Sequence, residues 1–148
     1  MKVFILMVLT VVIIHSFFNS LYSFLAPFNY PEVRNLKIIG FVLGHLSIIG
    51  IVIAQLQMKQ SRGIGIDYEN KTQLITTGFF KLSRNPIYLL LLISLTGLFL
   101  IVPNAVTFAV LFAAWLILHV TMRLEEEFLE KQHGEAYLQY KHKIRRLL

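Results

Sequence analysis

The fold of this chain is decided by residues 86–122, which read PIYLLLLISLTGLFLIVPNAVTFAVLFAAWLILHVTM. This stretch contains no charged residue, and Pro103-Asn104 divides it into two apolar runs, 86–102 and 105–122. At about 1.5 Å of rise per residue, each run is close to the length of a helix that crosses the roughly 30 Å hydrocarbon core of a bilayer. Proline beside asparagine is a turn signal, so the two runs are predicted to form an antiparallel helical hairpin.

Two further apolar runs precede the hairpin, at about 3–26 and 38–58, and neither holds a charged residue. A cleaved signal peptide is the alternative for the first run, but its apolar part spans only about 7 to 15 residues. In the second run, Gly40 and Gly44 have a spacing that is typical of close helix packing. Segment 59–85 is polar and rich in turn residues, so it should lie outside the hydrocarbon.

The sequence therefore predicts an all-α polytopic membrane protein with four transmembrane helices and one domain, residues 1–148. The composition agrees, because 56% of the residues are hydrophobic and only 15% are charged, whereas soluble domains average about 25% charged residues. The chain has no cysteine, which excludes disulfides, thiolate metal sites and cysteine nucleophiles. No metal site of another kind is predicted.

The net charge of +6 follows from the predicted topology. Four spans place both ends of the chain and segment 59–85 on one side of the membrane, and that side carries 12 of the 14 Lys and Arg residues. Positive charge accumulates on the cytoplasmic side, so both termini are predicted to be cytoplasmic, in a bacterial or archaeal inner membrane. Contacts with membrane lipids explain the basic residues, and no nucleic-acid partner is expected.

Residues 123–148 are predicted to form a cytoplasmic tail. Apolar positions recur at helical spacing on both sides of Gly134, which is a plausible helix stop. The tail is therefore expected to be an amphipathic segment along the membrane interface. Its basic cluster from Lys141 to Arg146 is expected to contact lipid headgroups.

The hairpin has a geometrical consequence for polar residues at its two ends. A chain that crosses at Pro86 and returns by Met122 should bring residues 84–88 beside residues 123–127. Glu125 and Glu126 point about 100° apart on a helix, so at least one of them should face inward. A solvated acidic stretch that interacts with a helix dipole is the alternative interpretation.

Two segments on either side of the hairpin carry a family pattern: LITTGFFKLSRNPIYL at 74–89 and EEEFLEKQHGEAYLQY at 125–140. Together they resemble the isoprenylcysteine carboxyl methyltransferase and phospholipid methyltransferase superfamily of integral-membrane enzymes. The resemblance covers about the C-terminal half. Two positions depart from the family pattern: Asn85 stands where histidine is commoner, and His133 stands where phenylalanine usually precedes the glycine. Asparagine can form hydrogen bonds as a neutral imidazole does, but it cannot carry a proton near neutral pH.

The resemblance implies that S-adenosylmethionine binds from the cytoplasm and that its methyl group goes to a lipophilic small-molecule or lipid acceptor. Carboxylates suit the ammonium group or the ribose hydroxyls of this cofactor, and an aromatic ring suits its sulfonium. Arg84 suits a carboxylate on either the cofactor or the acceptor. Transferred position by position, the cofactor-binding residues would be Gly78, Ser83, Asn85, Pro86, Tyr88, Glu125 and Glu126.

The predicted catalytic residues depend on the acceptor. A carboxylate acceptor needs no base, and Arg84 or Arg123 would orient it, whereas an amine acceptor must lose a proton, for which His119 is the candidate. Interhelical hydrogen bonding is the alternative role of His119. Two other functions stay open, a nicotinamide-dependent membrane reductase of the sterol type and a non-enzymatic helical membrane scaffold. The oligomeric state is not predicted.

Overall fold

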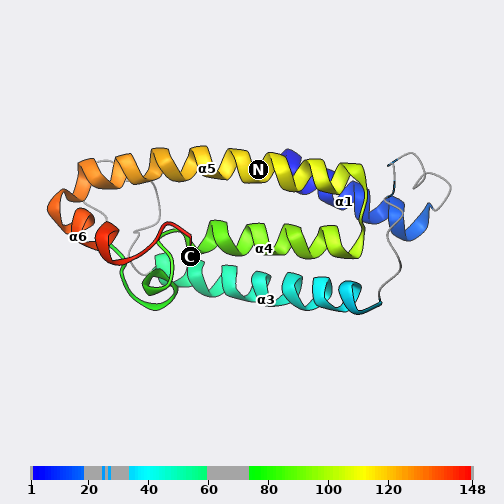
Figure 1. Cartoon of the computed structure of the whole chain (residues 1–148), viewed down its shortest axis with the longest axis horizontal. Coiled ribbons are helices and arrows are strands. Elements are labelled where there is room, and N and C mark those ends of the chain that lie inside the picture. Colours follow the sequence, from blue (N-terminus) through cyan, green and yellow to red (C-terminus); the bar gives the residue numbers. More distant parts are fainter. Residues whose placement is uncertain (1, 19–24, 26, 28–33, 60–73, 148) are drawn as a thin grey trace. The chain divides into compact units, whose positions relative to one another are not determined.

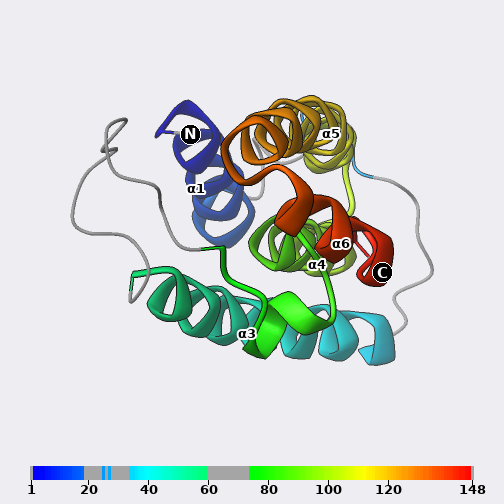
Figure 2. The same cartoon turned by 90° about the vertical axis from the view of Figure 1, so that its left-hand side faces the viewer.

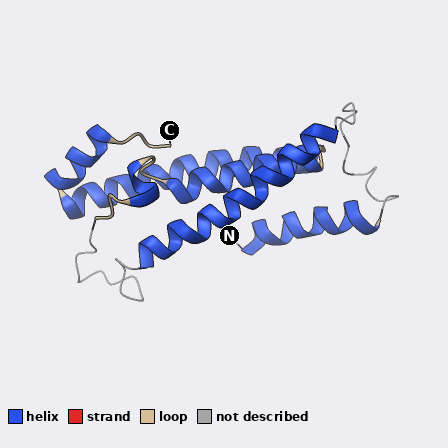
Figure 3. Cartoon of the chain, turned by 90° about the horizontal axis from the view of Figure 1, so that it is seen from below, coloured by secondary structure: helices blue, strands red, loops and turns tan. Residues whose placement is uncertain are grey.

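The computed structural model describes residues 2–18, 25, 27, 34–59 and 74–147, and the regular structure in this part of the chain is helical (Figures 1 and 3). No β-strand occurs among these residues, so the prediction of an all-α chain is confirmed. The elements are α1 (Lys2–Phe17), α3 (Arg34–Lys59), the short 3-10 helix η2 (Gly78–Lys81), α4 (Pro86–Ile101), α5 (Ala105–His133) and α6 (Glu135–Lys143).

Two of the described helices, α3 and α5, are long and apolar enough to cross a membrane, and α4 is a shorter apolar helix. Large apolar side chains are exposed along α3, including Phe41 at 57% and Leu46 at 62%. Lipid rather than water is the favourable surrounding for an apolar surface of this length. The first predicted span is described only as α1, because most of residues 18–26 lie outside the described part. Four crossings and a cytoplasmic location of both termini stay predictions.

The chain divides into two compact units, one made of Met1–Ser47 and Leu92–Leu116 and the other of Ile48–Leu91 and Ile117–Leu148. Helices α3, α4 and α5 each contribute residues to both units. The first unit holds the turn of the hairpin, and the second holds the two polar segments on either side of the hairpin, 74–89 and 125–140.

The hairpin turn forms at the predicted place in the first unit. Helix α4 ends at Ile101 and α5 begins at Ala105. Asn104 is fully buried, and its Oδ1 accepts a 2.9 Å hydrogen bond from the backbone N–H of Thr107. The Thr107 hydroxyl in turn accepts from Asn104 N at 3.2 Å and donates to Val102 O at 2.7 Å. This reciprocal capping starts α5 without leaving buried backbone groups unpaired.

Close helix packing is present in the first unit at Gly40, whereas a Cβ atom on Gly44, the other predicted glycine, would meet nothing within 4 Å. A Cβ atom added to Gly40 would lie 2.5 Å from Gly97 O, and one added to Gly97 would lie 2.6 Å from Gly40 O. Helices α3 and α4 therefore approach backbone to backbone here, and only glycine fits on both sides.

Helix α5 continues past residue 122, where the predicted fourth span ends and the predicted tail begins. It runs to His133, and the break comes at Gly134, the predicted helix stop, whose φ is +55°. The continuation has a packing reason: Leu118, Met122 and Glu126 follow one another at four-residue spacing, and all three are buried. The three successive glutamates therefore do not end the helix, because one of them lies on its buried face.

Candidate functional site

The segment before α4 is tied to the end of α3 by Gln57, a residue that the sequence analysis did not single out. Gln57 Oε1 accepts a 3.2 Å hydrogen bond from the backbone N–H of Phe79 in η2. Gly78 starts η2 with a φ of +60°, and a Cβ atom there would overlap the Gln57 side chain. The positive φ therefore favours glycine at position 78, and a larger residue would also have to displace the end of the Gln57 side chain. This role is structural, and it places the following residues at the start of α4.

Ser83 and Asn85 form the entry to α4, and both are buried. The Ser83 hydroxyl accepts a 3.1 Å hydrogen bond from Asn85 N, and Asn85 O accepts the 3.1 Å hydrogen bond of Leu89 N in the first turn of the helix. Pro86 is the first helical residue, where its missing N–H is not needed. The predicted residues Ser83, Asn85 and Pro86 therefore sit together at one helix start.

The two ends of the hairpin meet at Tyr88 and Glu125. The Tyr88 hydroxyl donates a 2.9 Å hydrogen bond to Glu125 Oε2 across 37 residues of sequence. Polar groups that are distant in sequence are thus neighbours, as the hairpin geometry predicts. Of the three successive glutamates, Glu126 is 4% exposed, Glu125 is half-buried and Glu127 is exposed, so the prediction that at least one faces inward is confirmed.

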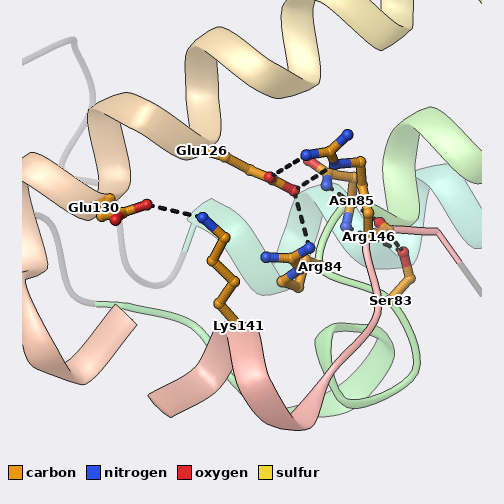
Figure 4. A network of polar contacts seen from close by, with 7 residues as sticks. All are labelled: Ser83, Arg84, Asn85, Glu126, Glu130, Lys141 and Arg146. Carbon is orange, nitrogen blue, oxygen red and sulfur yellow. Dashed lines mark hydrogen bonds and ion pairs between the residues drawn. The ribbon is translucent and has the colours of Figure 1, made fainter. Parts of the chain in front are cut away.

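Glu126 binds two arginines at once (Figure 4). Arg146 forms a two-pronged pair with it, from Nε to Oε1 at 3.0 Å and from Nη2 to Oε2 at 2.7 Å. Arg84 Nη2 lies farther from Oε1, at 3.4 Å. Two guanidinium groups therefore share one buried carboxylate, and the cluster keeps a net positive charge.

The segment after α6 closes over the entry to α4. The backbone carbonyl of Arg145 accepts a 3.0 Å hydrogen bond from Arg84 N. The carbonyl of Arg146 accepts two hydrogen bonds, from Ser83 Oγ at 3.1 Å and from Asn85 Nδ2 at 3.2 Å. Sequence analysis assigned Arg146 to headgroup contact and missed these interactions, because no spacing rule links it to residues about 60 positions earlier.

Arg84 has unused hydrogen-bonding capacity. Its side chain is 9% exposed, and its Nε and Nη1 atoms are buried with no hydrogen-bond partner among the described residues. Buried donors without acceptors cost free energy, and charged ones cost the most. An anionic group that reached Arg84 would satisfy these donors and balance the net charge of the cluster.

Helix α6, seen in front of α4 in Figure 2, carries two buried tyrosines, Tyr137 and Tyr140. The Tyr140 hydroxyl donates a 2.6 Å hydrogen bond to Phe80 O. Burial raises the pKa of both Tyr137 and Tyr140 to about 12. At Tyr137 the negative charge of Glu126 adds to the effect on the pKa, and the neighbouring Arg84 opposes it through its charge and a side-chain hydrogen bond. Both phenols are therefore neutral hydrogen-bonding groups at physiological pH.

The remaining predicted catalytic residues lie on α5. His119 is half-buried, six residues before Glu125. Arg123 is exposed and forms no ion pair among the described residues 74–147. Geometry thus supports Arg84 over Arg123 as the arginine of the site. His119 keeps its two alternative roles.

Fold and site together define a helical protein of membrane type, in which a helical hairpin brings two polar segments together. The sequence pattern of the family described as phospholipid methyltransferase matches residues 36–136, and the chain belongs to this family. Two relatives from rice, Oryza sativa subsp. indica and subsp. japonica, are each described as a probable protein-S-isoprenylcysteine O-methyltransferase. Each is 30% identical to this chain over 121 residues, which cover 78% of this chain and 63% of the relative. The chain thus spans less than two thirds of the length of these relatives.

Proposed function

We propose that this protein transfers a methyl group from S-adenosylmethionine to a lipophilic acceptor in the membrane. Membership of the phospholipid methyltransferase family and the description of the rice relatives support this class of reaction. The observation that carries the proposal is the buried Arg84, which has two donors without acceptors among the described residues. The Tyr88–Glu125 pair joins the same two segments of the chain.

The residues present fit the groups of this cofactor. Arg84 offers buried N–H groups to a carboxylate, which a guanidinium binds with two parallel hydrogen bonds. Glu125 is half-buried and suits an ammonium group or ribose hydroxyls, and the Tyr88 ring beside it suits a sulfonium. Glu126 differs from the role expected for it, because both of its oxygens are taken by arginines. It would act on the cofactor through those arginines.

S-adenosylmethionine supplies a methyl group on a positively charged sulfur. The task of the protein is to align the acceptor atom with that methyl group, and such alignment can contribute about 7 to 11 kcal/mol to lowering the barrier. A carboxylate acceptor forms the new O–CH₃ bond as the C–S bond breaks, the electron pair stays on sulfur, and no proton is released. No base is then required.

The charge of the site favours a carboxylate acceptor over an amine. Arg84 and Arg146 share the single carboxylate of Glu126, so these arginines attract an anionic acceptor, whereas Glu125 suits the ammonium group of the cofactor. An amine acceptor would also need a group that takes its proton, and His119 is the candidate on α5. A prenylated cysteine with a free carboxylate is therefore the preferred acceptor class.

The test uses the purified full chain in detergent. Isothermal titration should give micromolar binding of S-adenosylmethionine and no comparable binding of reduced nicotinamide cofactor. Label from methyl-labelled S-adenosylmethionine should enter N-acetyl-S-farnesylcysteine, and should not enter the carboxamide of the same molecule or phosphatidylethanolamine. Micromolar affinity for the nicotinamide cofactor alone would reject the methyltransferase proposal, and labelling of phosphatidylethanolamine alone would reject the carboxylate acceptor.

Arg84→Lys and Arg123→Lys form a matched pair of variants for this assay. Both keep the positive charge, but only Arg84 is buried in the cluster. Arg84→Lys loses the two-pronged geometry, so binding of the carboxylate-bearing ligand should weaken, whereas Arg123→Lys should behave as the original protein. Equal effects of the two substitutions would show that Arg84 is wrongly assigned.

A further inference from the structure

Glu126 is the acceptor for which Arg84 and Arg146 compete. Arg146 makes the two shorter contacts, at 3.0 and 2.7 Å, and so engages both carboxylate oxygens. Arg84 makes one longer contact, at 3.4 Å, through Nη2. Its Nε and Nη1 atoms are buried and have no hydrogen-bond acceptor among the described residues. Arg146, whose side chain is 34% exposed, thus makes the closer contacts with Glu126. Arg84, whose side chain is 9% exposed, makes only the longer contact.

Arg146 is held in this position by its own backbone. Its carbonyl accepts hydrogen bonds from Ser83 Oγ and Asn85 Nδ2, which flank Arg84 in sequence. The preceding carbonyl, of Arg145, accepts from Arg84 N. One residue therefore joins both halves of the site, the entry to α4 through its carbonyl and α5 through its guanidinium.

We propose that Arg146 is a positioning residue, which occupies Glu126 so that Arg84 keeps two N–H groups for the carboxylate of a ligand. The inference rests on the methyltransferase function proposed above. Without the Arg146 side chain, Glu126 would be buried beside Arg84 alone. Opposite charges in a poorly solvated place attract strongly, so Glu126 would take both prongs of Arg84 and leave the ligand without its partner.

A second substitution, at Glu126, should reverse the effect of a first substitution at Arg146. Arg146→Ala should weaken binding of the ligand whose carboxylate contacts Arg84 by about tenfold or more. If that ligand is S-adenosylmethionine, its dissociation constant should rise. If it is N-acetyl-S-farnesylcysteine, its KM should rise. The value of kcat should change much less. Adding Glu126→Gln to Arg146→Ala removes the carboxylate that captures Arg84, and should therefore restore most of the lost affinity.

Two single variants complete the set. Arg145→Ala removes a neighbouring, exposed positive charge and keeps the backbone, so it should leave both constants unchanged. Arg146→Lys keeps a positive charge beside Glu126 but cannot form the two-pronged pair, and should give an intermediate loss of ligand affinity. It also serves as the test variant if Arg146→Ala does not fold.

The outcomes separate this inference from the function on which it depends. Loss of affinity in Arg146→Ala and its recovery in the double variant would support the positioning role. Unchanged constants in Arg146→Ala, or a double variant weaker than either single variant, would overturn it while the original protein still binds S-adenosylmethionine. Absence of binding and of methyl transfer in the original protein would overturn both the function and this inference.

Discussion

Replacing Glu126 by glutamine tests how much the buried ion cluster contributes to stability. The change keeps the shape of the side chain and removes its charge. Two guanidinium groups, Arg84 and Arg146, then lie close together without the carboxylate that holds them. The matched control is Glu130→Gln, one helical turn later, where Lys141 Nζ pairs with Glu130 Oε2 at 2.9 Å.

The expected magnitudes differ because the two ion pairs differ in burial. The side chain of Glu126 is 5% exposed and that of Arg84 is 9% exposed, whereas those of Glu130 and Lys141 are 40% and 38% exposed. Removing one partner of a buried ion pair costs about 3 to 5 kcal/mol, because it leaves an uncompensated charge. Arg146 is 34% exposed and can turn toward solvent, so the lower limit, about 3 kcal/mol, applies to Glu126→Gln. An exposed pair contributes only about 0 to 1 kcal/mol.

The assay is reversible unfolding of both variants in mixed detergent micelles, followed by circular dichroism. Glu126→Gln should lower the free energy of unfolding by about 3 kcal/mol, and Glu130→Gln by less than about 1 kcal/mol. The double variant with Arg146→Ala should lose less than the sum of its parts, because one of the two unpaired charges is removed as well. Similar small losses for Glu126→Gln and Glu130→Gln would refute the argument, since burial would then make no difference to the pair.

Three further predictions concern packing and titration. Tyr140→Phe removes the 2.6 Å hydrogen bond to the backbone of η2, and should lower the free energy of unfolding by about 1 to 3 kcal/mol in the same assay. Gly97→Ala places a Cβ atom 2.6 Å from Gly40 O and should destabilise by about 1 to 3 kcal/mol, whereas a Cβ on Gly44 meets nothing within 4 Å, so Gly44→Ala should be tolerated. In an alkaline titration followed by phenolate absorbance, Tyr137 and Tyr140 should ionise near pH 12, later than the usual 10. Because the unfolded chain ionises first, the free energy of unfolding should fall as pH rises from 10 to 12, by at most about 3 kcal/mol per tyrosine. A single transition near the ordinary value would contradict the burial of both phenols.

The sequence predicts the hairpin well because the signals are local. A proline and an asparagine between two uncharged runs define a turn within four residues, and the structure ends α4 at Ile101 and starts α5 at Ala105. The close approach of α3 and α4 at Gly40 is likewise visible in the spacing of small residues. The meeting of Tyr88 with Glu125 then follows from the hairpin itself, because the longer helix α5 runs back past the start of α4.

The sequence fails where the outcome depends on a distant partner. The sequence predicts that at least one of the three successive glutamates faces inward but does not say which one. Glu126 is the buried one, and it pairs with cations 42 residues before it and 20 residues after it. Neither separation corresponds to a helical or strand period. Gln57 was missed for the same reason, since its contact with Phe79 bridges 22 residues without any regular spacing.

The asparagine at position 85 becomes understandable once the cluster is seen. Asn85 Nδ2 donates to the carbonyl of Arg146, within a group of residues that already holds more positive than negative charge. A histidine at this position would titrate near neutral pH, and its protonation would add a charge beside two arginines. An amide donates the same hydrogen bond at every pH and adds no charge. Asparagine at position 85 therefore offers no proton carrier, but it supplies the donor that contacts the Arg146 carbonyl. Because it stays neutral, it adds no positive charge beside the two arginines.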